Sequence, residues 1–130
     1  MRATPNRTIS DEEAECVRIT LEKAATIPDA IALIPSIAHL RVVGGCECGC
    51  ASVGFVKEQL GVSQPIADGT GKTALGGGVG IIVWGANNLI TALEVYDLGA
   101  GDDDLNLPVP NSIVSWDHTE AKQALGADSP

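Results

Sequence analysis

The stretch VGIIVWGANNLITALEVYD, residues 79–97, decides the fold of this chain. Two runs rich in Ile, Val, Leu, Trp and Tyr flank the sequence Ala86-Asn87-Asn88. Aliphatic β-branched and aromatic residues favour strands, and asparagine tolerates the positive φ angles that a tight hairpin turn requires. The sequence therefore predicts an antiparallel hairpin over Val79–Asp97.

The second run of this hairpin has two faces, because successive side chains of a strand point to opposite sides. One face carries Leu89, Thr91, Leu93 and Val95, and the other carries Ile90, Ala92, Glu94 and Tyr96. Neither set is strongly polar. We therefore expect a central pair of strands that is covered on both sides.

A helix precedes the strands. Ser10 and Glu13 have the spacing of a capping box, in which the serine hydroxyl and the glutamate side chain each bind a backbone N–H at the helix start. Apolar residues then recur at three- and four-residue spacing until Pro28 stops the pattern. Cys16 lies next to this stripe, either at its edge or facing solvent. A second short helix is expected over Asp29–Ile34, ended by Pro35.

The order of these elements predicts an α+β fold, with one or two N-terminal helices packed on a mainly antiparallel sheet of four to five strands. Three further strands are read from LRVVGG, CASVGFV and PIADGTG. The chain of 130 residues has the length of one domain, residues 1–130. Residues 1–9 are expected to be flexible, and residues 119–130 to form a short helix and a frayed tail.

Charge excludes several classes of partner. The formal net charge is −9, from eight Lys and Arg against seventeen Asp and Glu, and the basic residues are scattered. Nucleic acids and acidic membranes are therefore not expected as partners. A small molecule, a metal ion or a basic protein surface remains as a candidate partner.

The sequence also predicts where the protein acts. The N-terminus shows no apolar leader, and the apolar run Ile31–Leu40 is too short for a membrane span, so we expect a cytoplasmic protein with reduced cysteines.

Two motifs resemble ligand sites without completing them. DGTGKT, residues 68–73, lacks the first glycine of a phosphate-binding loop, where Ile66 stands, and a strand follows it instead of a helix. DDDLN, residues 102–106, lacks the Gly and Glu of a calcium loop, where Leu107 and Ile113 stand. We expect a loop between strands at the first motif and a solvated acidic loop at the second.

The segment GGCECGC, residues 44–50, is the main candidate for a metal site. On a regular strand, Cys46, Cys48 and Cys50 would share a face about 6.6 Å apart, with the outer two about 13 Å apart. Zinc needs its sulfur ligands about 4 Å from each other. An extended segment therefore makes the three cysteines packing residues, which is the interpretation that we favour.

If the glycines bend the segment, the same cysteines become zinc ligands. Glycine permits the positive φ angles that curl a backbone around an ion. The fourth ligand would then be Cys16, His39 or His118. A reactive thiol is a third interpretation, but the motif has no Lys, Arg or His that would lower a thiol pKa.

The combination of LRVVGGCECGCASVGF, IADGTG, VGIIVWGANNLITALEVYDLG and LPVP resembles small uncharacterised bacterial proteins. These proteins carry a C-x-C-G-C segment, then a strand, and later a tryptophan-containing hairpin that ends in LEVY. The resemblance covers roughly residues 34–110, and its most specific parts are Cys46, Cys48, Gly49, Cys50, Trp84 and the range Leu93–Tyr96. It implies a domain of unknown function, with no reaction or ligand to carry over.

The sequence favours a small acidic domain that acts by binding and not by catalysis. The expected partner is another protein or further copies of the same chain. Antitoxin and immunity-type inhibitors, which neutralise basic partners by charge complementarity, have this size and charge. Two alternatives stay open: a protein that binds zinc through Cys46, Cys48 and Cys50, and an enzyme that depends on a cysteine. No other cofactor is expected.

Overall fold

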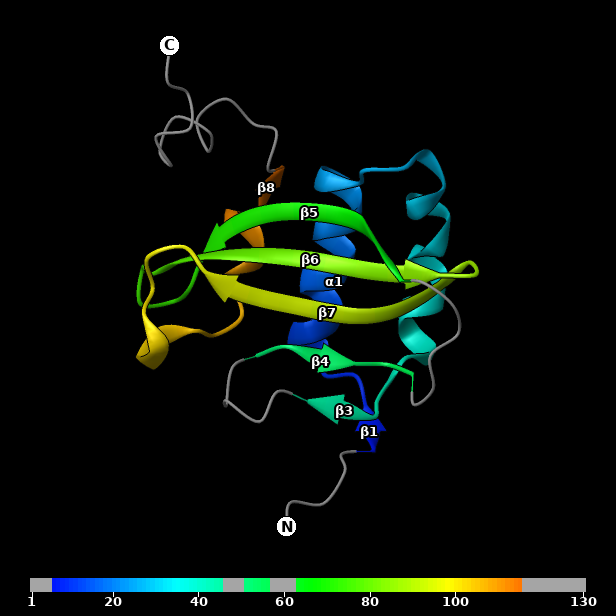
Figure 1. Ribbon diagram of the computed structural model, residues 1–130, viewed down its shortest axis with the longest axis horizontal. Helices are drawn as coiled ribbons and strands as arrows, with labels where there is room; N and C mark the ends of the chain where they lie inside the picture. The colour runs from blue at the N-terminus through cyan, green and yellow to red at the C-terminus, as the bar shows by residue number, and fades with distance from the viewer. Residues whose placement is uncertain (1–5, 46–50, 57–62, 116–130) are drawn as a thin grey trace.

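A helix packs against an antiparallel main sheet in the computed structural model of the chain, which describes residues 6–45, 51–56 and 63–115 (Figure 1). The elements in chain order are β1 (Arg7–Thr8), α1 (Asp11–Ala24), the 3₁₀ helix η1 (Pro28–His39), β2 (Arg41–Val42), β3 (Gly44–Gly45), β4 (Val53–Gly54), β5 (Gln64–Lys72), β6 (Gly78–Ala86), β7 (Leu89–Asp97), the short 3₁₀ helices η2 (Asp102–Asp104) and η3 (Pro110–Ser112), and β8 (Val114–Ser115).

The α+β class is confirmed, and the sheet is larger than expected. Six strands pair in the order β3-β4-β7-β6-β5-β8, and β1 pairs with β2 in a separate two-stranded sheet. All the pairings between these strands are antiparallel. The additional strands are two residues long and lie at the edges, where a sequence pattern of alternation is too short to detect.

The hairpin over β6 and β7 forms as predicted. Ala86 pairs with Leu89 across the turn, and the two residues between them have positive φ angles, 53° at Asn87 and 64° at Asn88. Positive φ at both central residues is the geometry that matches the twist of the flanking strands. The two asparagines therefore fix the register of the hairpin.

One extra residue in β7 changes the faces that strict alternation predicts. Trp84 pairs with Ala92 whereas the next residue, Gly85, pairs with Ile90, so Thr91 has no residue opposite it. Such a bulge shifts the alternation by one position. Ile90 and Leu93 are consequently both buried, although the sequence placed them on opposite faces.

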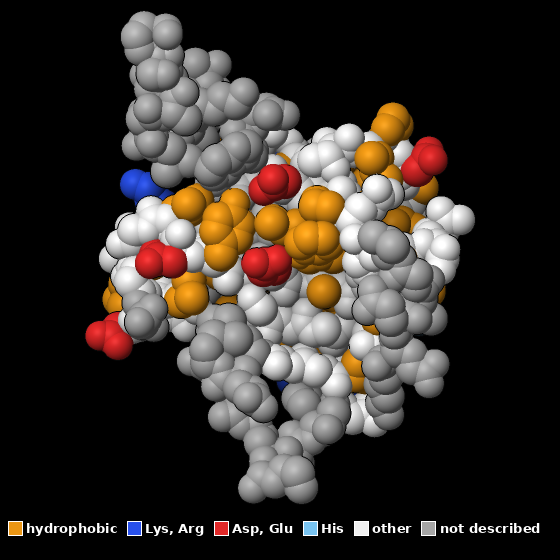
Figure 2. Space-filling view, viewed as in Figure 1, with side chains coloured by type: hydrophobic (Ala, Val, Ile, Leu, Met, Phe, Trp, Pro, Cys, Tyr) orange, Lys and Arg blue, Asp and Glu red, His pale blue; other side chains and the backbone are white. Residues whose placement is uncertain are grey.

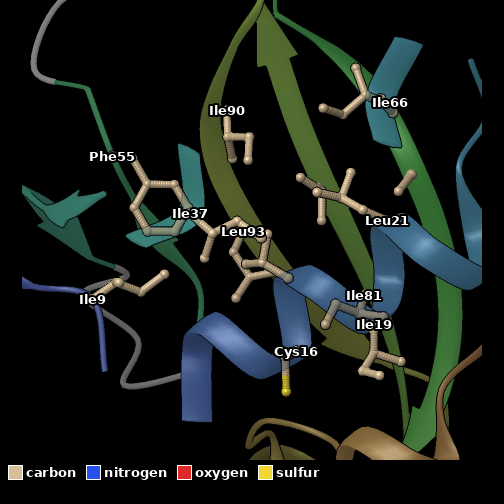
Figure 3. Packing of buried hydrophobic residues seen from close by; sticks show 14 of the residues in the cluster. Ile9, Cys16, Ile19, Leu21, Ile37, Phe55, Ile66, Ile81, Ile90 and Leu93 are labelled. Atoms are coloured by element: carbon tan, nitrogen blue, oxygen red, sulfur yellow. The ribbon is translucent and has the colours of Figure 1, made fainter. Parts of the chain in front are cut away.

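The core lies between α1 and one face of the sheet. Figure 1 shows α1 running behind the three long strands, and α1 contacts β5, β6, β8 and η1. Figure 3 shows Leu21 of α1 near Ile81 of β6, with Ile37 and Phe55 at the other end of the cluster. Because these side chains are nearly all aliphatic, burial of apolar surface is the main source of stability in this core.

The prediction that the central pair is covered on both sides is wrong for the described part of the chain. The side chains of β6 and β7 that point away from α1 remain half-exposed: Ile82, Trp84, Ala92, Glu94 and Tyr96. Figure 2 looks onto this side of the sheet. We call it the open face and define it by the residues that alternate outward on the long strands: Asp68, Thr70, Lys72, Gly80, Ile82, Trp84, Ala92, Glu94 and Tyr96.

Residues 68–72 belong to β5, so the loop expected at DGTGKT begins only at Thr73. Gly69 and Gly71 lie on the side of β5 that faces α1 and the C-terminal segment. A Cβ added at Gly69 would overlap the backbone of Val114, and one added at Gly71 would overlap Pro108. These glycines therefore permit close packing and do not form a phosphate-binding loop.

The N-terminus is ordered closer to its start than expected. Arg7 and Thr8 form β1, and Ile9 is buried in the core. Arg41 holds this strand, because its guanidinium donates hydrogen bonds to Asn6 and Thr8. Residues 7–9 of the segment expected to be flexible, residues 1–9, thus belong to β1 and the core. Residues 119–130 lie outside the described part of the chain.

The second helix runs past Pro35 to His39 as a 3₁₀ helix, so the predicted end at Pro35 is wrong. The fixed φ of proline is compatible with helical geometry, and its cost is the missing N–H. The hydroxyl of Ser36 donates a hydrogen bond to the carbonyl oxygen of Leu33 at 2.6 Å. The Ser36 side chain therefore satisfies the backbone carbonyl of Leu33, two residues before Pro35.

Candidate functional site

The open face places two carboxylates on either side of an apolar residue. In the register of the sheet, Ile82 of β6 pairs with Asp68 of β5 on one side and with Glu94 of β7 on the other. Neighbouring strands are about 4.8 Å apart, so the three residues form one row across the sheet. Acidic charge therefore lies at the centre of this face and not only at its rim.

Tyr96 lies in the adjacent row, opposite Gly80. A Cβ added at Gly80 would overlap the Tyr96 ring, so the ring lies flat on the backbone of β6. Burial raises the pKa of Tyr96, and the charges of Asp68 and Glu94 raise this pKa further. The phenol therefore stays protonated at neutral pH and adds a hydrogen-bonding group beside the carboxylates.

Trp84 and Glu94 form a fixed pair. The indole Nε1 donates a hydrogen bond to Oε1 of Glu94 at 2.9 Å, between residues that lie diagonally across β6 and β7. Both side chains are half-exposed. The bond orients the indole and leaves Oε2 of the carboxylate without a hydrogen-bond donor among the described residues.

A groove runs from this pair toward the short edge strands. Its volume is about 540 Å³, within the range of ligand-binding clefts. The Trp84–Glu94 pair lines it at one side, and Gly44, Gly45 and Gly54 line it at the other. A Cβ added at any of these three glycines would meet no atom of the described residues within 4 Å, so no described side chain closes the groove above them.

The open face is acidic and apolar. Figure 2 shows orange apolar side chains and red acidic side chains gathered over the long strands. Lys72, at the end of β5, is the one basic residue in the set that defines this face. A ligand that approaches the centre of the face therefore meets negative charge beside aromatic rings.

A second hollow, of about 630 Å³, lies between α1 and η1. Two of its charged side chains, Arg18 and Glu15, are paired at 2.6 Å, and Arg18 also donates a hydrogen bond to Glu22 at 2.7 Å. Exposed pairs of this kind contribute little to stability, and the remaining charge of this hollow, Asp11, is exposed at the start of α1 with no aromatic side chain in the lining beside it. The Trp84–Glu94 groove is therefore the stronger candidate.

The predicted zinc ligands Cys46, Cys48, Cys50 and His118 lie outside the described residues. Gly45 and Val53, on either side of the cysteine segment, are paired antiparallel. In the described ranges, no group of three His, Cys, Asp or Glu side chains is arranged to hold a metal ion. His39 is exposed at the end of η1.

Cys16, expected at the edge of the helix or in solvent, is fully buried. Its thiol donates a hydrogen bond to the carbonyl oxygen of Pro108 at 3.4 Å, and Figure 3 shows the sulfur pointing toward the C-terminal segment. Burial, reinforced by the charges of Glu12, Glu15 and Glu13, raises the pKa of Cys16 to about 12. A metal ligand needs the thiolate, so this environment suits packing.

The two incomplete motifs meet in a buried cluster. The hydroxyl of Thr73, from DGTGKT, donates a hydrogen bond to Oδ2 of Asp104, from DDDLN. Asn106 donates to the other carboxylate oxygen at 3.3 Å, and the backbone N–H of Gly77 donates to the Thr73 hydroxyl at 3.1 Å. The expectation of a solvated loop is therefore wrong for Asp104, which joins two loops.

The chain matches no model of a protein family, no curated protein sequence and no solved structure in three separate comparisons. Among the helices of the described residues, none combines the length and the apolar character needed to cross a bilayer. The functional conclusion therefore rests on the geometry of the open face.

Proposed function

We propose that this chain is a binding protein that takes a basic protein partner on the open face of its sheet. The observation that carries the proposal is the row Asp68–Ile82–Glu94, flanked by Trp84 and Tyr96. It combines a half-exposed apolar and aromatic surface, typical of interface centres, with two carboxylates. The net charge of −9 would also speed the approach of a cationic partner.

A different protein is favoured over a second copy of this chain. In a two-fold dimer the same patch meets itself. The open face would then bring the half-exposed Glu94 carboxylates of the two protomers into one interface. Like charges brought together in an interface cost free energy, whereas lysine and arginine side chains of a basic partner would neutralise them.

An inhibitor of the antitoxin or immunity type is a narrower form of this proposal. Such a protein, acting in the cytoplasm, would use an acidic face to cover a basic functional surface of its partner. The support for this subtype is the charge of the chain. The broader proposal, a basic protein on the open face, does not depend on it.

The proposal is tested by titrating the isotope-labelled protein with a decalysine peptide at low salt and following backbone amide signals by NMR. We expect shifts concentrated at Ile82, Trp84, Glu94 and Tyr96. Glu94→Gln should weaken binding, since glutamine keeps an acceptor for Trp84 and removes only the charge. Higher salt should weaken binding of the unmodified protein, because screening reduces attraction between exposed charges.

Glu12→Gln is the matched control, because it removes one exposed carboxylate from α1, on the other side of the sheet. If Glu12→Gln weakens binding as much as Glu94→Gln does, the attraction follows net charge alone and the open face is not the site. Shifts confined to α1 and η1 would also overturn the proposal.

The zinc alternative at Cys46, Cys48 and Cys50 has its own test. Protein purified without chelator is compared with a Cys46→Ser/Cys48→Ser/Cys50→Ser variant by elemental analysis and thermal unfolding. One zinc per chain in the first protein and none in the second would establish a zinc site. Two metal-free proteins of equal stability would reject it.

The cysteine-enzyme alternative requires a fast-reacting thiol. Titration of the thiols in the native, unmodified protein tests this alternative.

A further inference from the structure

We propose that the groove beside Trp84 and Glu94 binds an arginine side chain of the partner. The inference rests on the proposed function, because it names the residue type that the open face recognises. It starts from the fixed indole and carboxylate pair, in which Nε1 of Trp84 donates to Oε1 of Glu94 at 2.9 Å. Both residues line the groove of about 540 Å³.

The polar groups of the groove call for a ligand that donates hydrogen bonds. Ser52 is occupied by the backbone of Val95, from which its hydroxyl accepts at 2.8 Å and to which it donates at 3.2 Å. Ser63 and Thr91 are hydrogen-bonded to each other at 3.0 Å. Among the described residues, Oε2 of Glu94 keeps open acceptor sites in this lining, so a cationic donor fits and an anion is repelled.

The indole beside this carboxylate distinguishes arginine from lysine. A guanidinium group is planar and weakly hydrated, so it stacks on an aromatic face while its N–H groups reach a carboxylate. A lysine ammonium is compact and strongly hydrated, and it gains less from the ring. A side chain that lies along the Trp84 ring and ends at Glu94 therefore favours arginine.

The far side of the groove has room for the backbone of the partner. In the part of the chain that the structure describes, an added Cβ at Gly44, Gly45 or Gly54 would meet nothing within 4 Å, so these glycines leave space above them. A volume of about 540 Å³ also exceeds what one side chain needs. The groove therefore accommodates an arginine together with its neighbours in an extended segment.

The test uses three peptides of the form acetyl-Gly-Ser-Gly-X-Gly-Ser-Gly-amide, in which X is arginine, lysine or citrulline. The chain has two tryptophans, so Trp116→Phe is introduced to make the fluorescence report on Trp84. We expect arginine to bind about five-fold tighter than lysine, from the stacking contribution. Citrulline keeps the shape and lacks the charge, and should bind at least about ten-fold more weakly than arginine.

Three variants separate the contributions. Glu94→Gln should weaken binding of the arginine peptide. The control Glu12→Gln should bind this peptide as tightly as the unmodified protein does. Trp84→Leu should abolish the preference for arginine over lysine. Where Trp84→Leu does not fold, Trp84→Phe retains a ring without the N–H donor. This variant should keep part of the preference for arginine over lysine. Because it lacks the reporting tryptophan, binding is followed by the NMR shifts of Ile82 and Ala92.

The outcomes distinguish this inference from the proposed function. Equal binding of arginine and lysine peptides on the open face would overturn the arginine site and leave the basic-partner proposal standing. A preference for arginine that survives Trp84→Leu, or that is undiminished in Trp84→Phe, would also overturn it. If neither these peptides nor decalysine bind at low salt, both proposals fail. Tighter arginine binding that is lost in Trp84→Leu and Glu94→Gln would establish the site.

Discussion

The ring of Tyr96 lies directly on the backbone of Gly80, its partner across β6 and β7. Glycine is a weak strand former because it has no side chain to pack. Here the tyrosine ring fills the space that a side chain at position 80 would occupy. Gly80 is therefore buried although it faces away from the core.

Replacing Gly80 by alanine should destabilise the fold by about 1–3 kcal/mol, the usual cost of inserting a methyl group into a filled space. The new Cβ would have to displace the Tyr96 ring. In a Tyr96→Ala background the same substitution should become neutral or stabilising, because alanine favours strands more than glycine does. Urea unfolding of the four proteins in the cycle measures this change of sign.

Gly54→Ala is the control for that cycle, because a Cβ at Gly54 meets no atom of the described residues within 4 Å. Its cost should stay below that of Gly80→Ala. Equal costs at the two positions would mean that loss of glycine, and not overlap with Tyr96, destabilises the strand.

Much of this fold follows from local sequence. The asparagine pair sets the turn of the hairpin, and Ser10 with Glu13 begins the helix, because both depend on residues within four positions of each other. The amphipathic stripe likewise predicts that α1 packs on a sheet. Such features need no knowledge of distant contacts.

The features that sequence could not give depend on distant contacts. The extra residue at Thr91 appears only once β7 is paired with β6. The burial of Cys16 depends on Pro108, which is 92 residues away. The Trp84–Glu94 pair required the register of two strands, although alternation already placed Glu94 and Tyr96 on one face.

Ser10→Ala should destabilise the protein by about 1 kcal/mol, the typical cost of losing an N-cap side chain. The Ser10 hydroxyl accepts a hydrogen bond from the backbone N–H of Glu13 at 3.0 Å. Ser10→Gly should cost only about a few tenths of a kcal/mol, since glycine is itself a tolerated cap. Thermal unfolding of both variants checks the order, and an equal cost would contradict the capping role.

Because of Glu13, the free energy of unfolding should depend on pH in the acid range, below the usual pKa of a glutamate. Hydrogen bonds from Arg7, at 2.8 and 2.9 Å, and from the backbone N–H of Ser10 hold the pKa of Glu13 below its usual value of 4.5. Since the folded state lowers this pKa, the stabilisation is complete above pH 4.5 and is lost as pH falls through the lower folded value.

Glu13→Gln tests this pH dependence, because glutamine keeps an acceptor for the Ser10 N–H and removes the charge that Arg7 binds. The difference in unfolding free energy between the unmodified protein and Glu13→Gln should be largest near pH 7 and shrink below pH 4.5. Chemical denaturation at several pH values measures it. A difference that does not change with pH would mean that the charge of Glu13 contributes nothing.

The thiol of Cys16 should not react with a thiol reagent until the protein unfolds. Its thiol is fully buried and bonded to Pro108, and its pKa is raised to about 12, so the reactive thiolate is scarce at neutral pH. In the Cys46→Ser/Cys48→Ser/Cys50→Ser variant, Cys16 is the remaining cysteine. A disulfide reagent should label it only at the rate at which the protein opens, and labelling should become immediate in denaturant. Fast labelling of the native variant would contradict the packing of α1 against the C-terminal segment.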